Sequence, residues 1–180
     1  VLLMTATPIP RTLTMTIYGD MDLSIIREKP NIRKPVKTYS KLENKIDDIV
    51  KFVNKEIKLG NQIFWVCPLI EESKKIDHSS AVKKFEFLKK LFPKQVHLLH
   101  GKTTIEEKET ILNKFLKNDF KILVSTTIIE VGIDFPNANV IIIENANKFG
   151  LSQLHQLRGR VGRGNKESSC ILMFKSNLSE

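Results

Sequence analysis

Short apolar runs rich in β-branched residues alternate along the chain with longer segments whose apolar residues recur at helical spacing. The clearest run, residues 140–143, reads Val-Ile-Ile-Ile and predicts a strand buried on both faces. Further strands are expected at residues 36–39, 62–69, 96–99, 122–125 and 169–174. Because helical segments separate these runs, the crossovers are right-handed, and the pattern predicts an α/β fold with a mainly parallel sheet and helices on both faces.

Residues typical of helix starts indicate where two of the helices begin. Ser40 with Glu43, and Thr104 with Glu107, both have the spacing of a capping box. Each box precedes apolar residues at helical spacing, so each is expected to open an amphipathic helix. Further helices are expected at residues 81–92 and 151–157, the first with these side chains facing inward: Val82, Phe85, Leu88 and Leu91.

The chain is basic, with 29 Lys and Arg against 20 Asp and Glu and a formal net charge of +9. Such a surface favours a polyanion as partner, although many lysine-rich proteins bind none, so the charge alone leaves a nucleic-acid partner open. The hydrophobic fraction of 41% is typical of a globular domain. No apolar run reaches the ~18 residues of a membrane span, and we expect no membrane partner.

Two cysteines, Cys67 and Cys170, lie far apart in apolar segments. Neither belongs to a Cys-x-x-Cys or Cys/His spacing, so we expect buried, reduced thiols and no metal site. This usage favours the reducing cytoplasm. The chain starts at Val1 inside a strand-like run and lacks the basic start of a signal peptide, so we expect it to be a piece of a longer protein.

The segment from Gln156 to Gly164 carries three arginines within six positions, separated by glycines. Guanidinium groups hold phosphate oxygens bidentately, and glycine lets the backbone approach a ligand and adopt positive φ. The segment therefore indicates either a phosphoanhydride site or a basic turn that contacts a nucleic-acid backbone. The residues by themselves leave both interpretations open.

A second segment, from Ser125 to Pro136, begins with Thr126 and Thr127 directly after a predicted strand. Hydroxyl and backbone N–H groups at this position can contact phosphates. An ordinary strand-to-helix cap is the competing interpretation.

Together these segments resemble the conserved motifs of superfamily 2 helicases. Gln156-Leu-Arg-Gly-Arg-Val-Gly-Arg163 is similar to motif VI, and the pair Thr126-Thr127 followed by Gly132-Ile-Asp134 is similar to motif V. Thr5-Ala-Thr7 is similar to motif III. The motifs stand in the family's order and span nearly the whole chain. The sequences around them, Thr-Pro-Ile-Pro-Arg-Thr after Ala6 and Val66-Cys-Pro-Leu-Ile-Glu-Glu-Ser73, are similar to the branched-DNA repair helicases of this superfamily.

The resemblance implies a RecA-like three-layer sandwich. Residues 1–35 would be the tail of a first motor lobe with a linker, and residues 36–180 the second lobe. It also implies roles for particular residues. The ATP side of the site would comprise Arg160 and Arg163 as arginine fingers, Gln156 as a sensor of the γ-phosphate, and Gly132 and Asp134 near the nucleotide. The DNA contacts would be Thr126, Thr127, His100, Gly101 and Lys102, and the residues coupling hydrolysis to movement Thr5 and Thr7.

The sequence contains no Gly-x-x-x-x-Gly-Lys-[Ser/Thr] phosphate loop and no acidic Walker B sequence. ATP and Mg²⁺ would therefore be held mainly by the first motor lobe, and we expect this chain alone to be inactive as an ATPase. The implied partners are branched or forked DNA, and the first motor lobe and wedge domain of the same full-length chain. The implied location is the bacterial cytoplasm, in association with the nucleoid.

Three other interpretations remain. The first is the same lobe in a transcription-repair coupling factor, which shares the motif III and motif VI sequences, although the stretch from Val66 to Ser73 favours the branched-DNA helicases. The second is a nucleic-acid-binding module without catalysis, which would not explain Arg160 and Arg163 beside Gln156 and Asp134. The third, a simple nucleotide-binding βαβ fold, is disfavoured by the missing phosphate loop.

Overall fold

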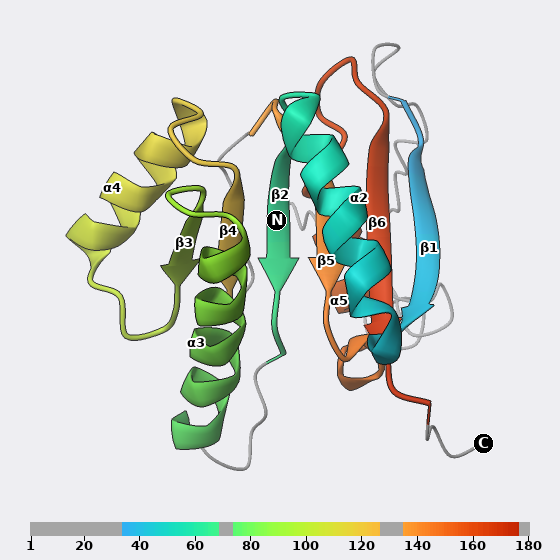
Figure 1. Cartoon of the computed structure of the whole chain (residues 1–180), viewed down its shortest axis with the longest axis horizontal. Coiled ribbons are helices and arrows are strands. Elements are labelled where there is room, and N and C mark those ends of the chain that lie inside the picture. Colours follow the sequence, from blue (N-terminus) through green and yellow to red (C-terminus); the bar gives the residue numbers. More distant parts are fainter. Residues whose placement is uncertain (1–33, 69–73, 127–134, 177–180) are drawn as a thin grey trace, which may run out of the picture. The chain divides into compact units, whose positions relative to one another are not determined.

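The computed structural model describes residues 34–68, 74–126 and 135–176. At residues 74–79 it describes the backbone alone. Within them, six strands form one sheet in the order β1-β6-β5-β2-β4-β3 (Figure 1). Every pair of neighbouring strands is parallel. The strands are β1 (Val36–Leu42), β2 (Gln62–Val66), β3 (Val96–Leu99), β4 (Ile122–Ser125), β5 (Ala138–Ile143) and β6 (Ser168–Phe174).

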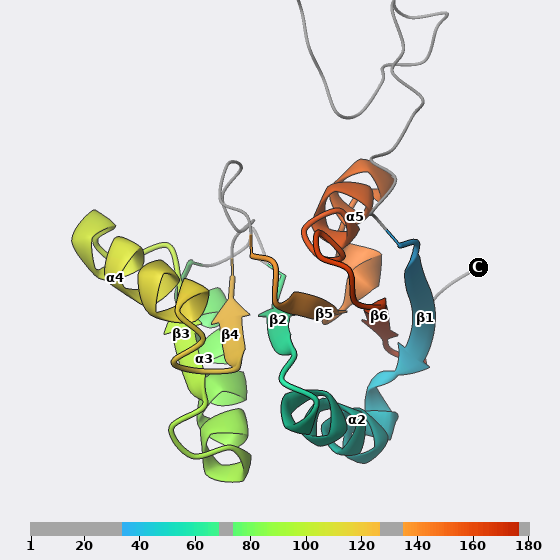
Figure 2. The ribbon, with the colours of Figure 1, turned by 90° about the horizontal axis from the view of Figure 1, so that it is seen from above.

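In the part of the chain that the structure describes, four α-helices cover the two faces of the sheet. They are α2 (Ile46–Lys58), α3 (Lys74–Leu91), α4 (Ile105–Leu116) and α5 (Leu151–Arg158), with short 3-10 turns η1 (Glu43–Lys45) and η2 (Ala146–Lys148). Viewed from above, α2 and α3 lie on one side of the row of strands and α4 and α5 on the other (Figure 2). The described residues thus form the three layers expected from the alternating pattern.

The core divides into two clusters because successive strand residues face opposite sides of the sheet. Phe64 and Val66 of β2 pack toward α4 and α5, whereas Ile63 and Trp65 pack toward α2 and α3. All six residues of β5 are buried, as predicted for its β-branched run. An aromatic group fills the first cluster, with neighbouring ring centroids 5.1–5.5 Å apart: Phe64, Phe115, Phe120 and Phe135.

One of the two predicted capping boxes is present. The Thr104 hydroxyl accepts from the Glu107 N–H at 3.3 Å, and the Glu107 carboxylate accepts from the Thr104 N–H at 3.1 Å. The box at Ser40 was wrong, because β1 continues through Leu42 in a parallel ladder with β6 that pairs Ser40 with Leu172. The helix α2 then follows η1 without a side-chain cap. A long-range ladder therefore overrides the local capping signal.

The helix predicted over residues 81–92 is longer and slightly differently oriented. It begins at Lys74, and Leu88 is buried as expected, but Leu91 is 45% exposed and Phe92, just after the helix, takes the inward place. Both cysteines are buried and free, as predicted, and burial raises the pKa of the Cys170 thiol to about 11. Among the described residues, no helix is long and apolar enough to span a membrane.

Because all six strands run the same way, the sheet has an amino end, where the strands begin, and a carboxyl end, where they stop. Figure 1 shows the amino end at the top and the carboxyl end, with the arrowheads, at the bottom. The predicted site residues that the structure describes are divided between these two ends.

Candidate nucleotide and nucleic-acid site

The arginine-rich segment forms a loop over residues 159–167, between the end of α5 and the start of β6. We call it the arginine loop. It lies at the amino end of the sheet because α5 runs back along the sheet from the carboxyl end. The loop leaves the helix through a tight turn in which the Arg160 N–H donates to the Leu157 carbonyl at 3.0 Å. Val161 is fully buried between the two predicted finger residues, so it anchors the loop in the core below α5.

Two glycines fix the path of this loop. Gly162 has φ +75°, and a Cβ there would stand 3.0 Å from the Val36 Cγ2 atom. Gly164 approaches another stretch of backbone, since a Cβ there would lie 2.8 Å from the Pro136 carbonyl oxygen. The fold itself therefore requires glycine at both positions, apart from any need to admit a ligand. Through Pro136, the arginine loop also packs against the end of the motif V segment.

The loop holds two like charges close to one another. Arg160 is half-buried, and this burial, together with the positive charge of Arg163, lowers the pKa of the Arg160 guanidinium. Arg163 is exposed, and Gln156 is half-buried on α5, one helical turn before Arg160. Desolvation and mutual repulsion both oppose the charged state of Arg160. An anion close to both guanidinium groups would oppose these two effects and favour the charged state of Arg160.

The other predicted contacts lie at the carboxyl end. Residues His100 to Thr103 form a turn after β3, in which the His100 Nδ1 atom accepts from the Lys102 N–H at 3.1 Å. The Thr103 hydroxyl accepts from the His100 N–H at 3.1 Å. We call this the β3 turn. His100 thus braces the turn through its ring nitrogen, whereas Gly101 and Lys102 are exposed.

Thr126 lies beside the β3 turn. Leu99 pairs with Ser125 in the β3–β4 ladder, and the Thr126 N–H donates to the Leu99 carbonyl at 3.3 Å. The structure therefore brings together the two segments that were expected to contact a nucleic-acid backbone. Thr127, Gly132, Asp134, Thr5 and Thr7 lie outside the described residues.

The arginine loop and the β3 turn are at opposite ends of the sheet. They are separated by at least a strand length, roughly 13 Å for a four-residue strand at about 3.3 Å per residue. Ligands of open parallel sheets usually bind at the carboxyl ends of the strands. The β3 turn and Thr126 lie at such ends, whereas Arg160 and Arg163 precede a strand.

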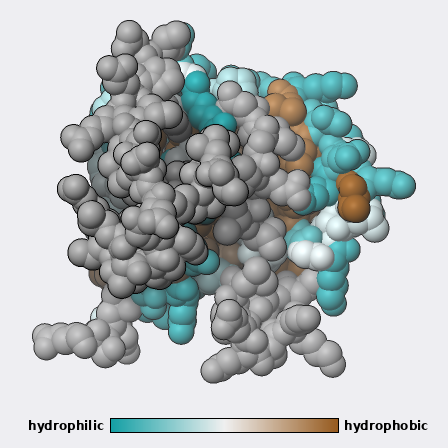
Figure 3. Space-filling model, turned by 180° about the vertical axis from the view of Figure 1, so that it is seen from behind, coloured by the Kyte–Doolittle hydropathy of each residue, from teal (hydrophilic) through white to brown (hydrophobic). Residues whose placement is uncertain are grey.

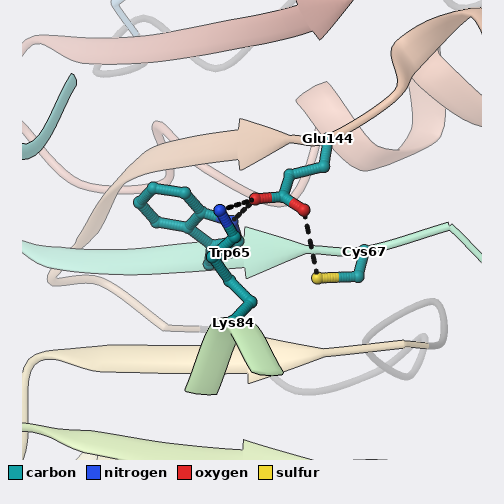
Figure 4. Close-up of polar contacts among 4 residues, drawn as sticks. All are labelled: Trp65, Cys67, Lys84 and Glu144. Carbon is teal, nitrogen blue, oxygen red and sulfur yellow. Dashed lines mark hydrogen bonds and ion pairs between the residues drawn. The ribbon is translucent and has the colours of Figure 1, made fainter. Parts of the chain in front are cut away.

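Sequence reasoning missed a polar cluster beside the β2 carboxyl end. There the Glu144 carboxylate accepts from the Trp65 indole N–H at 2.8 Å and pairs with the Lys84 ammonium at 2.8 Å (Figure 4). The Cys67 thiol donates to its second oxygen at 3.8 Å, and burial is the main reason that the pKa of this thiol is raised. Glu144 thereby ties β5, β2 and α3 together. A carboxylate directly after a run of buried strand residues was the available signal.

The described surface visible in Figure 3 is mostly hydrophilic, with hydrophobic side chains in small separate patches. Among the described residues there is no group of three or more His, Cys, Asp or Glu side chains placed to hold a metal ion.

The chain is similar to known helicases. The helicase conserved C-terminal domain model matches residues 44–165. The ATP-dependent DNA helicase RecG of Bacillus subtilis (strain 168) is 51% identical over 96% of the chain and 26% of its own length. RecG of Aquifex aeolicus (strain VF5) is 53% identical over 98% of the chain and 22% of its own length. The chain thus spans about a quarter of the length of these relatives.

A solved structure of RecG bound to a three-way DNA junction superposes with a TM-score of 0.79 at 45% identity, over 97% of this chain and 23% of that chain. The parallel sheet between two helical layers is accordingly the RecA-like fold of a helicase C-terminal lobe. From the matched model and the fold, the chain belongs to the family of helicase conserved C-terminal domains.

Proposed function

We propose that this chain is the second motor lobe of a RecG-type ATP-dependent DNA helicase that acts on forks and junctions. Support comes from the identity to RecG along almost the whole chain, and from the junction-bound RecG structure that it resembles. The observation that carries the proposal is the arginine loop, which holds the half-buried Arg160 and the exposed Arg163 close enough for their charges to interact.

At the amino end, Arg160 and Arg163 would contact the γ-phosphate of ATP bound to the first lobe. Water attacks the γ-phosphorus, the bond to the leaving oxygen of ADP breaks, and ADP, inorganic phosphate and a proton are released. Negative charge redistributes toward the leaving oxygen during this step, and paired guanidinium groups stabilise it. Gln156 would sense the γ-phosphate from α5, with Gly132 and Asp134 near the nucleotide.

The chain supplies only one side of this reaction. The β-phosphate and Mg²⁺ would be held by the first lobe, and Mg²⁺ would neutralise charge on the phosphates there. Thr5 and Thr7 would couple the two lobes, with residues 1–35 as the tail of the first lobe and the linker. The wedge domain of the full-length protein would decide which branched DNA is preferred.

At the carboxyl end, Thr126, Thr127 and the β3 turn would contact the DNA backbone. Threonine hydroxyl groups and the Lys102 ammonium are suited to phosphate contacts that position DNA without reading its sequence. The backbone N–H groups of Thr126 and Lys102 already donate within the fold. Closure of the lobes around ATP at one end would shift the DNA contacts at the other end. We place the full-length protein in the bacterial cytoplasm, on the nucleoid.

The test uses the full-length protein that carries this lobe, as wild type and as Arg160→Ala. ATP turnover is measured with and without forked DNA, and fork binding is measured in the same buffer. We expect turnover to fall at least ~10³-fold with fork affinity retained. A loss of fork affinity with turnover unchanged at saturating DNA would mean that the arginine loop grips DNA instead, which is the non-catalytic interpretation.

A further inference from the structure

A buried chain of hydrogen bonds lies at the amino end of the sheet, next to the arginine loop. The Ser168 hydroxyl donates to the Asn139 Oδ1 atom at 3.3 Å. The Asn139 amide donates to the Asn61 Oδ1 atom at 3.0 Å and to the Asn137 carbonyl at 3.2 Å. Asn61 in turn donates to the Glu56 carboxylate at 2.6 Å. The hydrogen bonds run in one direction, from the Ser168 hydroxyl to the Glu56 carboxylate.

Asn139 is the centre of this network, and its position is costly unless every polar atom is satisfied. It is fully buried in β5, between Ala138 and a run of β-branched residues. Both amide protons and the amide oxygen have partners. Flipping the amide would set its oxygen against two other oxygens, so only one orientation fits. Asn139 therefore occupies a buried strand position suited to an apolar residue, and its amide is held in one orientation.

The network holds the arginine loop near its carboxyl-terminal end. Ser168 is the first residue after the loop, and its hydroxyl stands 3.3 Å from where a Cβ of Gly162 would be. Lys166, within the loop, donates to the Asn61 Oδ1 atom at 3.4 Å. Gly162 lies between Arg160 and Arg163, so Ser168 and Lys166 lie close to the backbone that carries both arginines.

We propose that Asn139 is a positioning residue for Arg160 and Arg163, acting through Ser168 and the path of the arginine loop. The inference rests on the proposed function, because positioning matters only if the arginines meet a phosphate. An arginine finger contributes through placement at the transition state, where a displacement of about 1 Å can cost ~10²-fold in rate. Loss of the network would therefore lower kcat and leave ATP and DNA binding largely intact.

The same sheet supplies a matched control. Gln62 in β2 is also buried, and its amide donates to the Phe115 and Phe120 carbonyls at 2.7 and 3.0 Å. Its bonds lead to α4 and the loop before β4. Asn139→Asp and Gln62→Glu are then the same chemical change. Each replaces an amide that donates to two oxygens by an acid of equal size. Only the first alters a side chain of the network, since Gln62 meets the network through its backbone N–H, which donates to the Asn137 carbonyl at 2.8 Å.

The experiment measures kcat and KM for ATP, with forked DNA saturating, in the full-length protein. Asn139→Asp is expected to lower kcat ~10- to 100-fold, with KM for ATP and fork affinity within about threefold. Gln62→Glu, normalised to folded protein by circular dichroism, should leave kcat within about threefold. Asn139→Asp is then added to Arg160→Ala and turnover followed with radiolabelled ATP. In the Arg160→Ala background, Asn139→Asp should change turnover by no more than about threefold, because Asn139 acts through Arg160.

Three outcomes would overturn the inference. They are an unchanged kcat in Asn139→Asp, an equal loss in Gln62→Glu, and a full further loss in the Arg160→Ala background. If Asn139→Asp does not fold, Ser168→Ala decides in its place, since it removes one donor and must still lower kcat at least about threefold. If Arg160→Ala itself leaves ATP turnover intact, the proposed function fails. If Arg160→Ala loses turnover but Asn139→Asp has the kcat of wild type, only the inference about Asn139 fails.

Discussion

The arginine loop and the β3 turn both carry glycine and basic residues, yet they are built in opposite ways. In the arginine loop, Gly162 has positive φ and a close neighbour, and Gly164 lies against the backbone of Pro136. In the β3 turn, a Cβ on Gly101 would meet no atom within 4 Å, and the turn is held by its own local hydrogen bonds. One loop is fixed by the fold around it, and the other is open to solvent.

This difference matches the tasks that the two ends would have. A finger must reach a transition state within a fraction of an ångström, so its backbone benefits from packing that leaves one conformation. Backbone contacts to DNA tolerate small displacements and gain from exposed charge. We therefore expect substitutions at the amino end to affect stability and chemistry, and those in the β3 turn to affect DNA affinity alone.

Gly162→Ala should destabilise the fold at the amino end. The left-handed backbone and the 3.0 Å approach to Val36 should together cost about 1–3 kcal/mol. Thermal or denaturant unfolding measures the loss. A variant as stable as wild type would show that the loop is not held as described, and the contrast between the two ends would lose its basis.

The cluster around Glu144 sharpens the comparison, because it is a packed part of the carboxyl end. Glu144→Gln keeps the shape of the side chain but removes the charge that pairs with Lys84, whose side chain is 21% exposed. We expect a loss of about 1–3 kcal/mol in the free energy of unfolding. The emission of Trp65, the single tryptophan of the chain, should also shift, since its N–H contacts this carboxylate. Unchanged stability in Glu144→Gln would mean that this cluster does not hold the carboxyl end of the sheet together.

Gly101→Ala should do the reverse of Gly162→Ala. With open space around it, the added methyl should change the free energy of unfolding by no more than about 0.5 kcal/mol. If a phosphate approaches the main chain here, affinity for forked DNA should fall several-fold, measured by fluorescence anisotropy. Retained affinity would remove Gly101 from the DNA contacts.

The smallest effect concerns pH. His97 of β3 stacks on Phe120 at 4.1 Å, and its buried Nδ1 atom has no hydrogen-bond partner among the described residues. Desolvation, with a smaller contribution from Lys114, lowers the pKa of His97 below its usual 6.5. The unfolded chain therefore binds the proton more tightly, and stability should decline as the pH falls below about 6.5. His97→Phe should weaken that dependence, and an identical pH profile in both proteins would contradict this assignment.

Local patterns predicted the features of this lobe that local sequence controls. The β-branched run before Glu144 gave a buried strand, and Thr104 with Glu107 formed its capping box. Ser40 failed because its neighbours pair with β6, more than a hundred residues away. Asn139 went unnoticed for the same reason, since its partners come from separate turns and strands. That the arginines lie at the amino end follows only from the path of α5 across the sheet.

The central claim, that phosphate chemistry and DNA contact occupy opposite ends of the sheet, is tested most directly by the salt dependence of fork binding. In the full-length protein, Lys102→Ala is compared with Arg163→Ala, an exposed cation removed from each end. We predict that Lys102→Ala lowers the slope of log affinity against log salt by about one, and that Arg163→Ala leaves the slope unchanged. The account would be contradicted if the slope became less steep in Arg163→Ala and did not change in Lys102→Ala. That result would place the DNA on the arginine loop.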